Sequence, residues 1–257
     1  MDLPMNTCRN SASLFHCKNI TKNYEEIPVV DDISLELPHK GFISLLGPSG
    51  IGKTTLLNVL AGLDKPDKGK VFLGDDDITG IPGRVGYMPQ KDLLLEHRTV
   101  LDNVILPLVI RGEKKEAARE KAASFFGEFG LSGYEKKYPR QLSGGMRQRA
   151  ALLRTCQTGN RIILLDEPFS SLDAITRSEM QEWYREISKN MELSTLFITH
   201  DIEEALLLSD TVYILNGKPG KITCAITVPP HQSGELNFTL SGEFSALKIN
   251  ILAAIKK

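Results

Sequence analysis

Residues 47–54 combine glycines, a lysine and a threonine at the spacing of a phosphate-binding loop. Their sequence, GPSGIGKT, fits the pattern G-x-x-x-x-G-K-[ST]. Glycines allow successive backbone N–H groups to turn inward, toward phosphate oxygens. Lys53 adds a positive charge for the outer phosphates of a nucleotide, and Thr54 offers a hydroxyl to Mg²⁺. The loop is therefore predicted to bind a nucleoside triphosphate with Mg²⁺.

The segments on either side of this loop have the character that such a loop needs. Residues 42–46 are almost continuously apolar, which is typical of a buried strand, and residues 55–60 favour a helix. The N-terminus of that helix would point its partial positive charge at the phosphates. The alternative is a glycine- and serine-rich turn that only resembles a phosphate loop.

A second apolar strand ends in two carboxylates, within the sequence RIILLDE at residues 161–167. In a doubly wound sheet, ligands bind at the carboxyl ends of the strands. We expect Asp166 to lie near the Mg²⁺ and Glu167 to orient or deprotonate an attacking water. An acidic strand end that faces solvent is the alternative.

A third motif, LSGGMRQ at residues 142–148, begins a predicted helix with two glycines. Ser143 can cap this helix, and the glycines leave its first N–H groups accessible. Such a helix start is a second place where an anion can bind. Taken alone, the motif fits an ordinary helix cap equally well.

Composition sets limits on the class of protein. The chain has 257 residues, 41% hydrophobic and 25% charged, which is enough to build a sizeable core. A net charge of -1 argues against nucleic-acid binding through bulk electrostatics. The cysteines, Cys8, Cys17, Cys156 and Cys224, lack C-x-x-C spacing and are predicted to be free thiols.

No apolar run approaches the ~20 residues that a membrane-spanning helix needs, and the first ten residues lack the apolar core of a signal peptide. We therefore expect a soluble, cytoplasmic protein that reaches a membrane only through a partner.

Strands alternate with helices along most of the chain, which predicts an α/β fold with a parallel sheet. The expected strands are residues 14–24, 29–37, 42–46, 71–73, 85–88, 162–165, 195–199, 211–215 and 222–228. The expected helices are residues 55–60, 99–110, 114–129, 142–154, 174–187, 202–208 and 241–255. The first two strands favour an antiparallel pair, the last two favour a hairpin, and residues 74–77 favour an acidic turn.

Taken in order, these motifs resemble those of the ATP-binding cassette (ABC) ATPases, from about residue 14 to residue 228. In that family residues 47–54 correspond to Walker A, 162–167 to Walker B, 142–148 to the signature and 170–173 to the D-loop. Gln90 resembles the Q-loop glutamine, His200 the switch histidine, and Tyr24 the aromatic residue that stacks on adenine. Each residue alone has a simpler explanation: packing for Tyr24, a surface polar group for Gln90, a helix cap for Asp173 and a structural histidine for His200.

The resemblance implies a fold and a domain division. The fold class is α/β, a P-loop NTPase of the ABC type, with a mixed-sheet core, an antiparallel β subdomain and an inserted helical subdomain. The ATPase domain would span residues 14–230, with the helical insert at about 92–156. Residues 231–257 would form a short C-terminal helical extension.

The resemblance also implies ATP and Mg²⁺ as cofactors and assigns residues to them. The expected catalytic residues are Glu167, His200 and Gln90. The expected ATP-binding residues are Tyr24, Gly47, Ser49, Gly50, Gly52, Lys53, Thr54, Thr55, Ser143, Gly145 and Asp173. The expected Mg²⁺ ligands are Thr54, Gln90 and Asp166.

In the family two cassettes enclose two ATP molecules head to tail, so the resemblance implies a homodimer in which Ser143 and Gly145 reach the partner's ATP. It further implies integral membrane permease subunits, an indirect link to an extracytoplasmic solute-binding protein, no nucleic acid, and a peripheral location on the cytoplasmic face of the membrane. Residues 93–104 would grip the permease; the alternative is that their leucines form the core face of a short helix.

Residues 166–177 and 199–206 look like those of importers of small organic nutrients, in the branch that handles nitrate, sulfonates, taurine and the pyrimidine precursor of thiamine. Residues 153–155, LRT, lean toward the thiamine-precursor group, whereas Glu96-His97 and Ser171 depart from common family residues. Two rival functions are an ATP-driven clamp on nucleic acid or the ribosome, and an inactive scaffold. The single short insert and net charge argue against the first, and intact Lys53, Asp166, Glu167 and His200 against the second.

Overall fold

The computed structural model describes residues 14–230 and 236–255. The expectations for Cys8, for the first ten residues and for parts of the extension at 231–257 lie outside these residues. Cys17, Cys156 and Cys224 are free thiols. Within the described ranges, none of the helices is both long and apolar enough to cross a membrane.

A six-stranded sheet forms the centre of the molecule. Its order is β10-β9-β3-β8-β7-β6, in which β3, β6, β7, β8 and β9 pair in parallel and β10 pairs antiparallel to β9. The strands are β3 (Phe42–Leu46), β6 (Gly86–Met88), β7 (Ile162–Asp166), β8 (Ser194–Thr199), β9 (Thr211–Asn216) and β10 (Lys221–Thr227). The expected α/β fold with a mixed central sheet is thereby confirmed.

A second, antiparallel sheet has the order β2-β1-β4-β5. Its strands are β1 (Phe15–Tyr24), β2 (Ile27–Leu37), β4 (Lys68–Leu73) and β5 (Asp76–Asp77). The pairing of the first two strands is as expected. The acidic turn at residues 74–77 is shorter than expected, because Asp76 and Asp77 pair with β4 and leave only Gly74 and Asp75 to turn.

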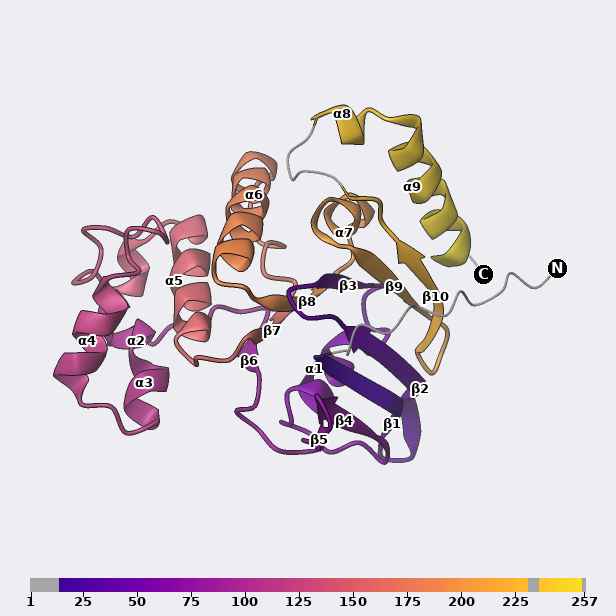
Figure 1. Ribbon diagram of the computed structural model, residues 1–257, viewed down its shortest axis with the longest axis horizontal. Helices are drawn as coiled ribbons and strands as arrows, with labels where there is room; N and C mark the ends of the chain where they lie inside the picture. Colours follow the sequence, from indigo (N-terminus) through magenta and orange to yellow (C-terminus); the bar gives the residue numbers. More distant parts are fainter. Residues whose placement is uncertain (1–13, 231–235, 256–257) are drawn as a thin grey trace.

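Helices cover the central sheet and extend from one end of it. They are α1 (Lys53–Leu60), α2 (Val100–Val104), α3 (Leu106–Ile110), α4 (Lys115–Ala123), α5 (Gly144–Cys156), α6 (Ala174–Asn190), α7 (Ile202–Leu208), α8 (Leu236–Thr239) and α9 (Gly242–Ile255), with a 3₁₀ turn η1 (Pro139–Gln141). Figure 1 shows α2, α3 and α4 at one end of the molecule and the antiparallel sheet below the central sheet in this view.

Two of the expected helices were wrong in extent. Residues 99–110 form two short helices that meet at Ile105, because Pro107 cannot donate a backbone hydrogen bond and its ring crowds the carbonyl of the previous turn. The helix expected at residues 114–129 ends at Ala123. The chain beyond it turns through Gly127 and through Gly130, whose φ is 63°.

The central sheet is buried on both faces, as continuously apolar parallel strands require. In β7, Ile163 and Leu165 pack into an apolar cluster with α2, α4, α5 and α6. The alternate residues Ile162 and Leu164 pack into a second cluster with α1 and the antiparallel sheet. The helical segment and the antiparallel sheet thus both pack onto β7, on its two faces.

The strand ends are level with one another. Leu46 of β3 pairs with Thr199 of β8, and Asp166 of β7 pairs with Ile198 of β8. Because these strands are parallel, the residues that follow them emerge at one edge of the sheet. This edge brings together the phosphate loop, the two carboxylates and His200.

Candidate functional site

Residues 47–54 lead from β3 into α1, as the sequence predicted. At two of these positions, steric contacts explain why the residue is glycine. Gly52 precedes α1 with a φ of 102°, and a Cβ atom there would lie 2.7 Å from Val30 Cγ1. A Cβ atom on Gly47 would lie 2.6 Å from the carbonyl oxygen of Leu215. The loop therefore folds against β2 and β9 in a way that only glycine permits at these positions.

Lys53 begins α1 and is only 5% exposed. Its ammonium donates hydrogen bonds to the carbonyl oxygens of Gly47 and Pro48, at 2.8 and 2.9 Å, and lies 3.8 Å from Glu167 Oε1. Burial lowers the pKa of Lys53, while the charges of Glu167 and Asp166 act in the opposite direction. The ammonium thus turns back onto its own loop, where it can meet phosphate oxygens.

Thr54 and Asp166 are in direct contact. The Thr54 hydroxyl donates to Asp166 Oδ2 at 2.9 Å, and Asp166 is almost completely buried. Burial raises the pKa of Asp166, and the hydrogen bond from Thr54 opposes that rise. A hydroxyl and a carboxylate are oxygen ligands of the kind that Mg²⁺ prefers, so this pair fits the cation that the sequence predicted.

Glu167 and His200 form the next contact in the same cluster. Glu167 Oε2 lies 3.1 Å from His200 Nδ1, and Glu167 is mostly buried whereas His200 is about half exposed. The backbone of Glu167 has a φ of 45°, and its N–H donates to the Ile198 carbonyl at 3.0 Å. A non-glycine residue in this conformation stores strain, which is common at functional sites.

Gln90 follows β6 and its side chain is exposed. Within the described residues, no hydrogen bond joins Gln90 to Thr54 or Asp166. The structure therefore places Gln90 at the same edge of the sheet as Thr54 and Asp166, without a hydrogen bond to either among the described residues.

Tyr24 ends β1 and is 45% exposed. Its hydroxyl donates to Asp64 Oδ2 at 2.7 Å, and the Lys22 ammonium lies 5.2 Å from its ring centroid. The hydrogen bond to Asp64 raises the pKa of Tyr24, whereas a hydrogen bond with Thr55 of α1 lowers it. The ring is therefore held beside the start of α1, where it is open to a planar ligand.

Ser143, Gly145 and Asp173 form a separate surface, which we call the signature surface. Ser143 caps α5 by accepting from Met146 N at 3.3 Å, and Asp173 caps α6 by accepting from Thr176 N at 3.0 Å. A Cβ atom on Gly145 would lie 3.1 Å from Thr176 Cγ2, so the two helix starts lie side by side. Ser143 and Asp173 are both exposed, and no hydrogen bond among the described residues joins them to Lys53, Thr54 or Asp166.

The remaining predicted ATP-binding residues lie in or next to the phosphate loop. Ser49 and Gly50 are exposed, and a Cβ atom on Gly50 would meet nothing within 4 Å. Thr55 is half-buried in the first turn of α1. These positions leave room for a nucleotide.

Sequence reasoning missed a buried network behind His200. Glu204 of α7 accepts hydrogen bonds from Gln181 and from Thr199, and it lines a cavity of about 40 Å³ together with Glu167, His200 and Arg177. The only signal in the sequence was the second of two glutamates, four residues after His200, at the start of a helix that is otherwise apolar.

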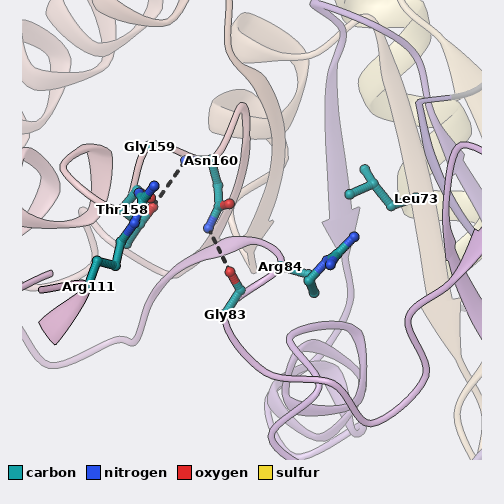
Figure 2. A pocket seen from close by; sticks show the side chains of 7 residues that line it. All are labelled: Leu73, Gly83, Arg84, Arg111, Thr158, Gly159 and Asn160. Atoms are coloured by element: carbon teal, nitrogen blue, oxygen red, sulfur yellow. Dashed lines mark hydrogen bonds between the residues drawn. The ribbon is translucent and has the colours of Figure 1, made fainter. Parts of the chain in front are cut away.

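A larger cavity, of about 430 Å³, lies away from this cluster (Figure 2). Gly83 precedes β6 and Asn160 precedes β7, so the cavity lies near the amino ends of these strands, opposite the phosphate loop. Asn160 Nδ2 donates to the Gly83 carbonyl at 3.2 Å, and Arg111 donates to the Thr158 carbonyl. Arg84 and Leu73 complete its far wall. This cavity does not belong to the nucleotide site.

Comparison with known proteins agrees with the geometry. Residues 30–170 match the family model described as ABC transporter. The formylaminopyrimidine import ATP-binding protein ThiZ of Halalkalibacterium halodurans is 42% identical over 230 residues, which cover 89% of this chain and 90% of that protein. The sulfate/thiosulfate import ATP-binding protein CysA of Mesorhizobium japonicum is 41% identical over 241 residues, which cover 91% of this chain and 70% of that protein.

A solved structure shares the fold as well. The dimeric structure of MJ0796, a bacterial ABC transporter cassette, superimposes with a TM-score of 0.73 and 28% identity, covering 84% of this chain and all of that one. The same cassette is also known in a dimeric post-hydrolysis state bound to ADP and Pi. The phosphate loop, the paired carboxylates, His200 and these similarities together show that the chain belongs to the ABC transporter family and is an ATP-binding cassette with ATPase activity.

Proposed function

We propose that this chain is the ATP-hydrolysing subunit of a membrane transporter that imports a small organic nutrient or anion. The observation that carries the proposal is the contact of the Thr54 hydroxyl with Asp166 at 2.9 Å, beside a lysine 3.8 Å from Glu167. One edge of the sheet thus holds the groups that phosphoryl transfer requires, namely positive charge, cation ligands and a base. ThiZ and CysA, whose names describe import ATP-binding proteins, support the transport role.

Thr54, Asp166 and Gln90 are the proposed Mg²⁺ ligands. The Thr54 hydroxyl lies 2.9 Å from Asp166 Oδ2, and Gln90 follows β6, which β8 and β7 separate from β3. When bound, Mg²⁺ would neutralise charge on the outer phosphates of ATP.

Glu167 is the proposed general base for the attacking water. His200, next to Glu167, is proposed to contact the γ-phosphate. When His200 Nδ1 carries its proton, it donates to Glu167 Oε2, and Nε2 remains available for the γ-phosphate. Lys53 is proposed to leave the carbonyls of its own loop and to bind the β- and γ-phosphates instead. Tyr24 is proposed to stack on adenine.

Two copies of the chain are proposed to bind head to tail. The signature surface of one copy would then meet the ATP that the phosphate loop of the other copy holds. Ser143 Oγ and the Gly145 N–H lie at the start of α5, where backbone donors and the helix dipole favour an anion. The dimeric form of MJ0796 supports this arrangement.

Permease subunits are proposed to bind at residues 93–104, which places the protein on the cytoplasmic face of the membrane, with only an indirect link to a solute-binding protein. The sequence left two alternatives for the leucines of this segment, a surface for the permease or the core face of a short helix, and the structure shows one leucine in each environment. Leu94 is buried in the core, whereas Leu93 is 59% exposed and its φ is 46°. Leu93 is therefore the leucine of this run that is available to a partner.

The imported molecule is proposed to be a pyrimidine precursor of thiamine or a small anion of the nitrate, sulfonate or taurine kind. ThiZ and CysA are named for different substrates, formylaminopyrimidine and sulfate or thiosulfate. The ThiZ similarity extends over nine tenths of that protein, which supports the pyrimidine.

The test is co-purification of tagged Glu167→Gln protein from detergent-solubilised membranes with ATP and Mg²⁺. The expected partners are a polytopic membrane protein and, through it, a solute-binding protein whose ligand names the substrate class. Omission of ATP serves as the control. Recovery of ribosomes or nucleic acid without a membrane subunit would contradict the transport role.

A further inference from the structure

Glu204 is a buried carboxylate directly behind Glu167 and His200. It lies on α7, is 7% exposed, and lines the cavity of about 40 Å³ that those two residues share. A buried carboxylate is unfavourable unless hydrogen-bond donors face it. The hydrogen-bond donors that face Glu204 therefore identify the elements that this buried carboxylate holds together.

Each carboxylate oxygen of Glu204 has a donor from a different element. Oε1 accepts from Gln181 Nε2 of α6 at 2.9 Å, and Oε2 accepts from the hydroxyl of Thr199, the last residue of β8. Thr199 immediately precedes His200. Glu204 therefore joins the strand end that carries His200 to the middle of α6.

The residues on both sides of His200 are fixed through this contact. Thr199 Oγ1 accepts from the backbone N–H of Asp201 at 3.0 Å. Asp201 in turn caps α7 by accepting from two backbone N–H groups of its first turn, at 2.8 and 3.2 Å, one of them that of Glu204. The His200 side chain, which is half exposed, can thus turn only as far as this anchored backbone allows.

The first turn of α6 is tied to the segment that leads from Glu167 to Asp173. Arg177 lies one helical turn before Gln181, on the same face of α6. It donates to the carbonyl oxygens of Phe169 and Leu172, at 3.3 and 2.7 Å. A displacement of Asp173 would therefore be carried by a rigid helix to Gln181 and on to Glu204.

We propose that Glu204 is a positioning residue for ATP hydrolysis, which orients His200 through Thr199 and couples it through Gln181 and Arg177 to the segment that carries Asp173. This inference rests on the proposed function, since His200 and Asp173 take the roles given there. A second cassette that contacts Asp173 then changes the orientation of His200 through contacts within one chain.

The experiment compares three variants of the purified full-length protein by steady-state ATP hydrolysis. Glu204→Ala removes both acceptors, and kcat is expected to fall about tenfold or more while KM for ATP changes by less than about twofold. Glu204→Gln keeps the size of the side chain and one acceptor oxygen for Gln181, and its amide NH2 can donate to the Thr199 hydroxyl, so this variant is expected to remain within about threefold of wild type. Glu203→Gln is the matched control on the same helix; its carboxylate is exposed and pairs with Lys248, and its kcat is expected to be unchanged.

A double-mutant cycle with His200→Ala separates positioning from loss of structure. If Glu204 acts through His200, the double variant is expected to be no more than about twofold slower than His200→Ala alone. Losses that multiply would overturn the inference, as would a Glu204→Gln variant as slow as Glu204→Ala. If Glu204→Ala does not fold by circular dichroism, Thr199→Val replaces it in the cycle, since it removes the hydroxyl and keeps the shape.

The outcomes also distinguish this inference from the proposed function. Wild-type protein that binds ATP but does not hydrolyse it, alone or with its permease, would overturn both. Active wild-type protein with an equally active Glu204→Ala variant would overturn the positioning role and leave the ATPase function standing.

Discussion

The phosphate-loop cluster and the signature surface differ in how completely one chain builds them. Within a single molecule, Lys53 lies 3.8 Å from Glu167 and Glu167 lies 3.1 Å from His200, while Thr54 and Asp166, their neighbours in the sequence, are 2.9 Å apart. On the signature surface, by contrast, each helix-start side chain contacts the backbone of its own helix. The first region is preorganised, whereas in the second Ser143 and Asp173 are exposed, with Gly145 buried beside Thr176 of α6.

This difference suggests how a nucleotide could act as a switch. The phosphate-loop cluster can hold ATP within one chain, whereas the signature surface offers helix N-termini that gain from an added anion. In the proposed head-to-tail dimer, a γ-phosphate held by one copy is the ligand for the other copy, so its hydrolysis would weaken the pairing. Substitutions in the phosphate-loop cluster should therefore change ATP affinity or the rate of hydrolysis, whereas substitutions on the signature surface should change dimer formation.

The largest effect is expected for Glu167→Gln, within the phosphate-loop cluster. We expect kcat for ATP hydrolysis to fall roughly 100-fold or more, because a positioned general base contributes about 10²–10⁴-fold. Binding of ATP should persist, since the amide keeps the size of the carboxylate. Glu179→Gln, an exposed position on α6, is the control. Near-normal turnover in the Glu167 variant would remove this residue from the mechanism.

Lys53→Ala should act on affinity rather than on the chemical step alone. We expect Kd for ATP to rise about tenfold or more, because a charge-assisted hydrogen bond contributes about 1.5–3 kcal/mol. Isothermal calorimetry measures this directly. Lys70→Ala, an exposed lysine of β4 paired with Asp77, should leave Kd unchanged. Equal affinities for the two variants would contradict the assignment of Lys53.

Tyr24 allows the ring and the hydroxyl to be tested separately. Tyr24→Ala is expected to weaken ATP binding roughly tenfold, because stacking of a base on an aromatic ring contributes about 1–3 kcal/mol. Tyr24→Phe keeps the ring, loses only the hydrogen bonds of the hydroxyl with Asp64 and Thr55, and should stay within about twofold of wild type. If the two variants weaken ATP binding equally, the hydroxyl and not the ring contributes to binding, and the proposal that Tyr24 stacks on adenine is wrong.

The smallest effect is expected for Asp166→Asn, which should stabilise the nucleotide-free protein to a degree that depends on pH. Burial raises the pKa of Asp166 in the folded protein, so its ionised form destabilises the nucleotide-free fold. Asp166→Asn should therefore raise Tm without nucleotide, and the gain should appear as pH rises from the ordinary aspartate pKa through the raised folded value. At lower pH both side chains are neutral and the two Tm values should converge. A gain that is largest in acid would contradict the sign of this argument.

The sequence predicted the phosphate-loop cluster well because parallel strands bring their carboxyl ends to one edge. Lys53, Asp166 and His200 each follow an apolar strand, so their proximity follows from the fold class alone. Pro107 already disfavours one continuous helix over residues 99–110, although the apolar spacing around it favours one.

Contacts between polar side chains of distant elements were beyond prediction. The pairing of Glu204 with Gln181 depends on the packing of α7 against α6, which no periodicity encodes. Asn103 is a similar case, since its fully buried side chain holds the backbone of Leu95 and Thr99. In each case the residue type suggested solvent, and the surrounding donors and acceptors made burial possible.

The most direct test of the account measures ATP-dependent assembly by sedimentation velocity. Glu167→Gln protein should be monomeric without nucleotide and dimeric with ATP and Mg²⁺. Adding Ser143→Asp keeps a good helix cap but places a negative charge against the partner's γ-phosphate, so this double variant should bind ATP and remain monomeric. A double variant that still dimerises with ATP would contradict the claim that the signature surface completes the site of a second copy.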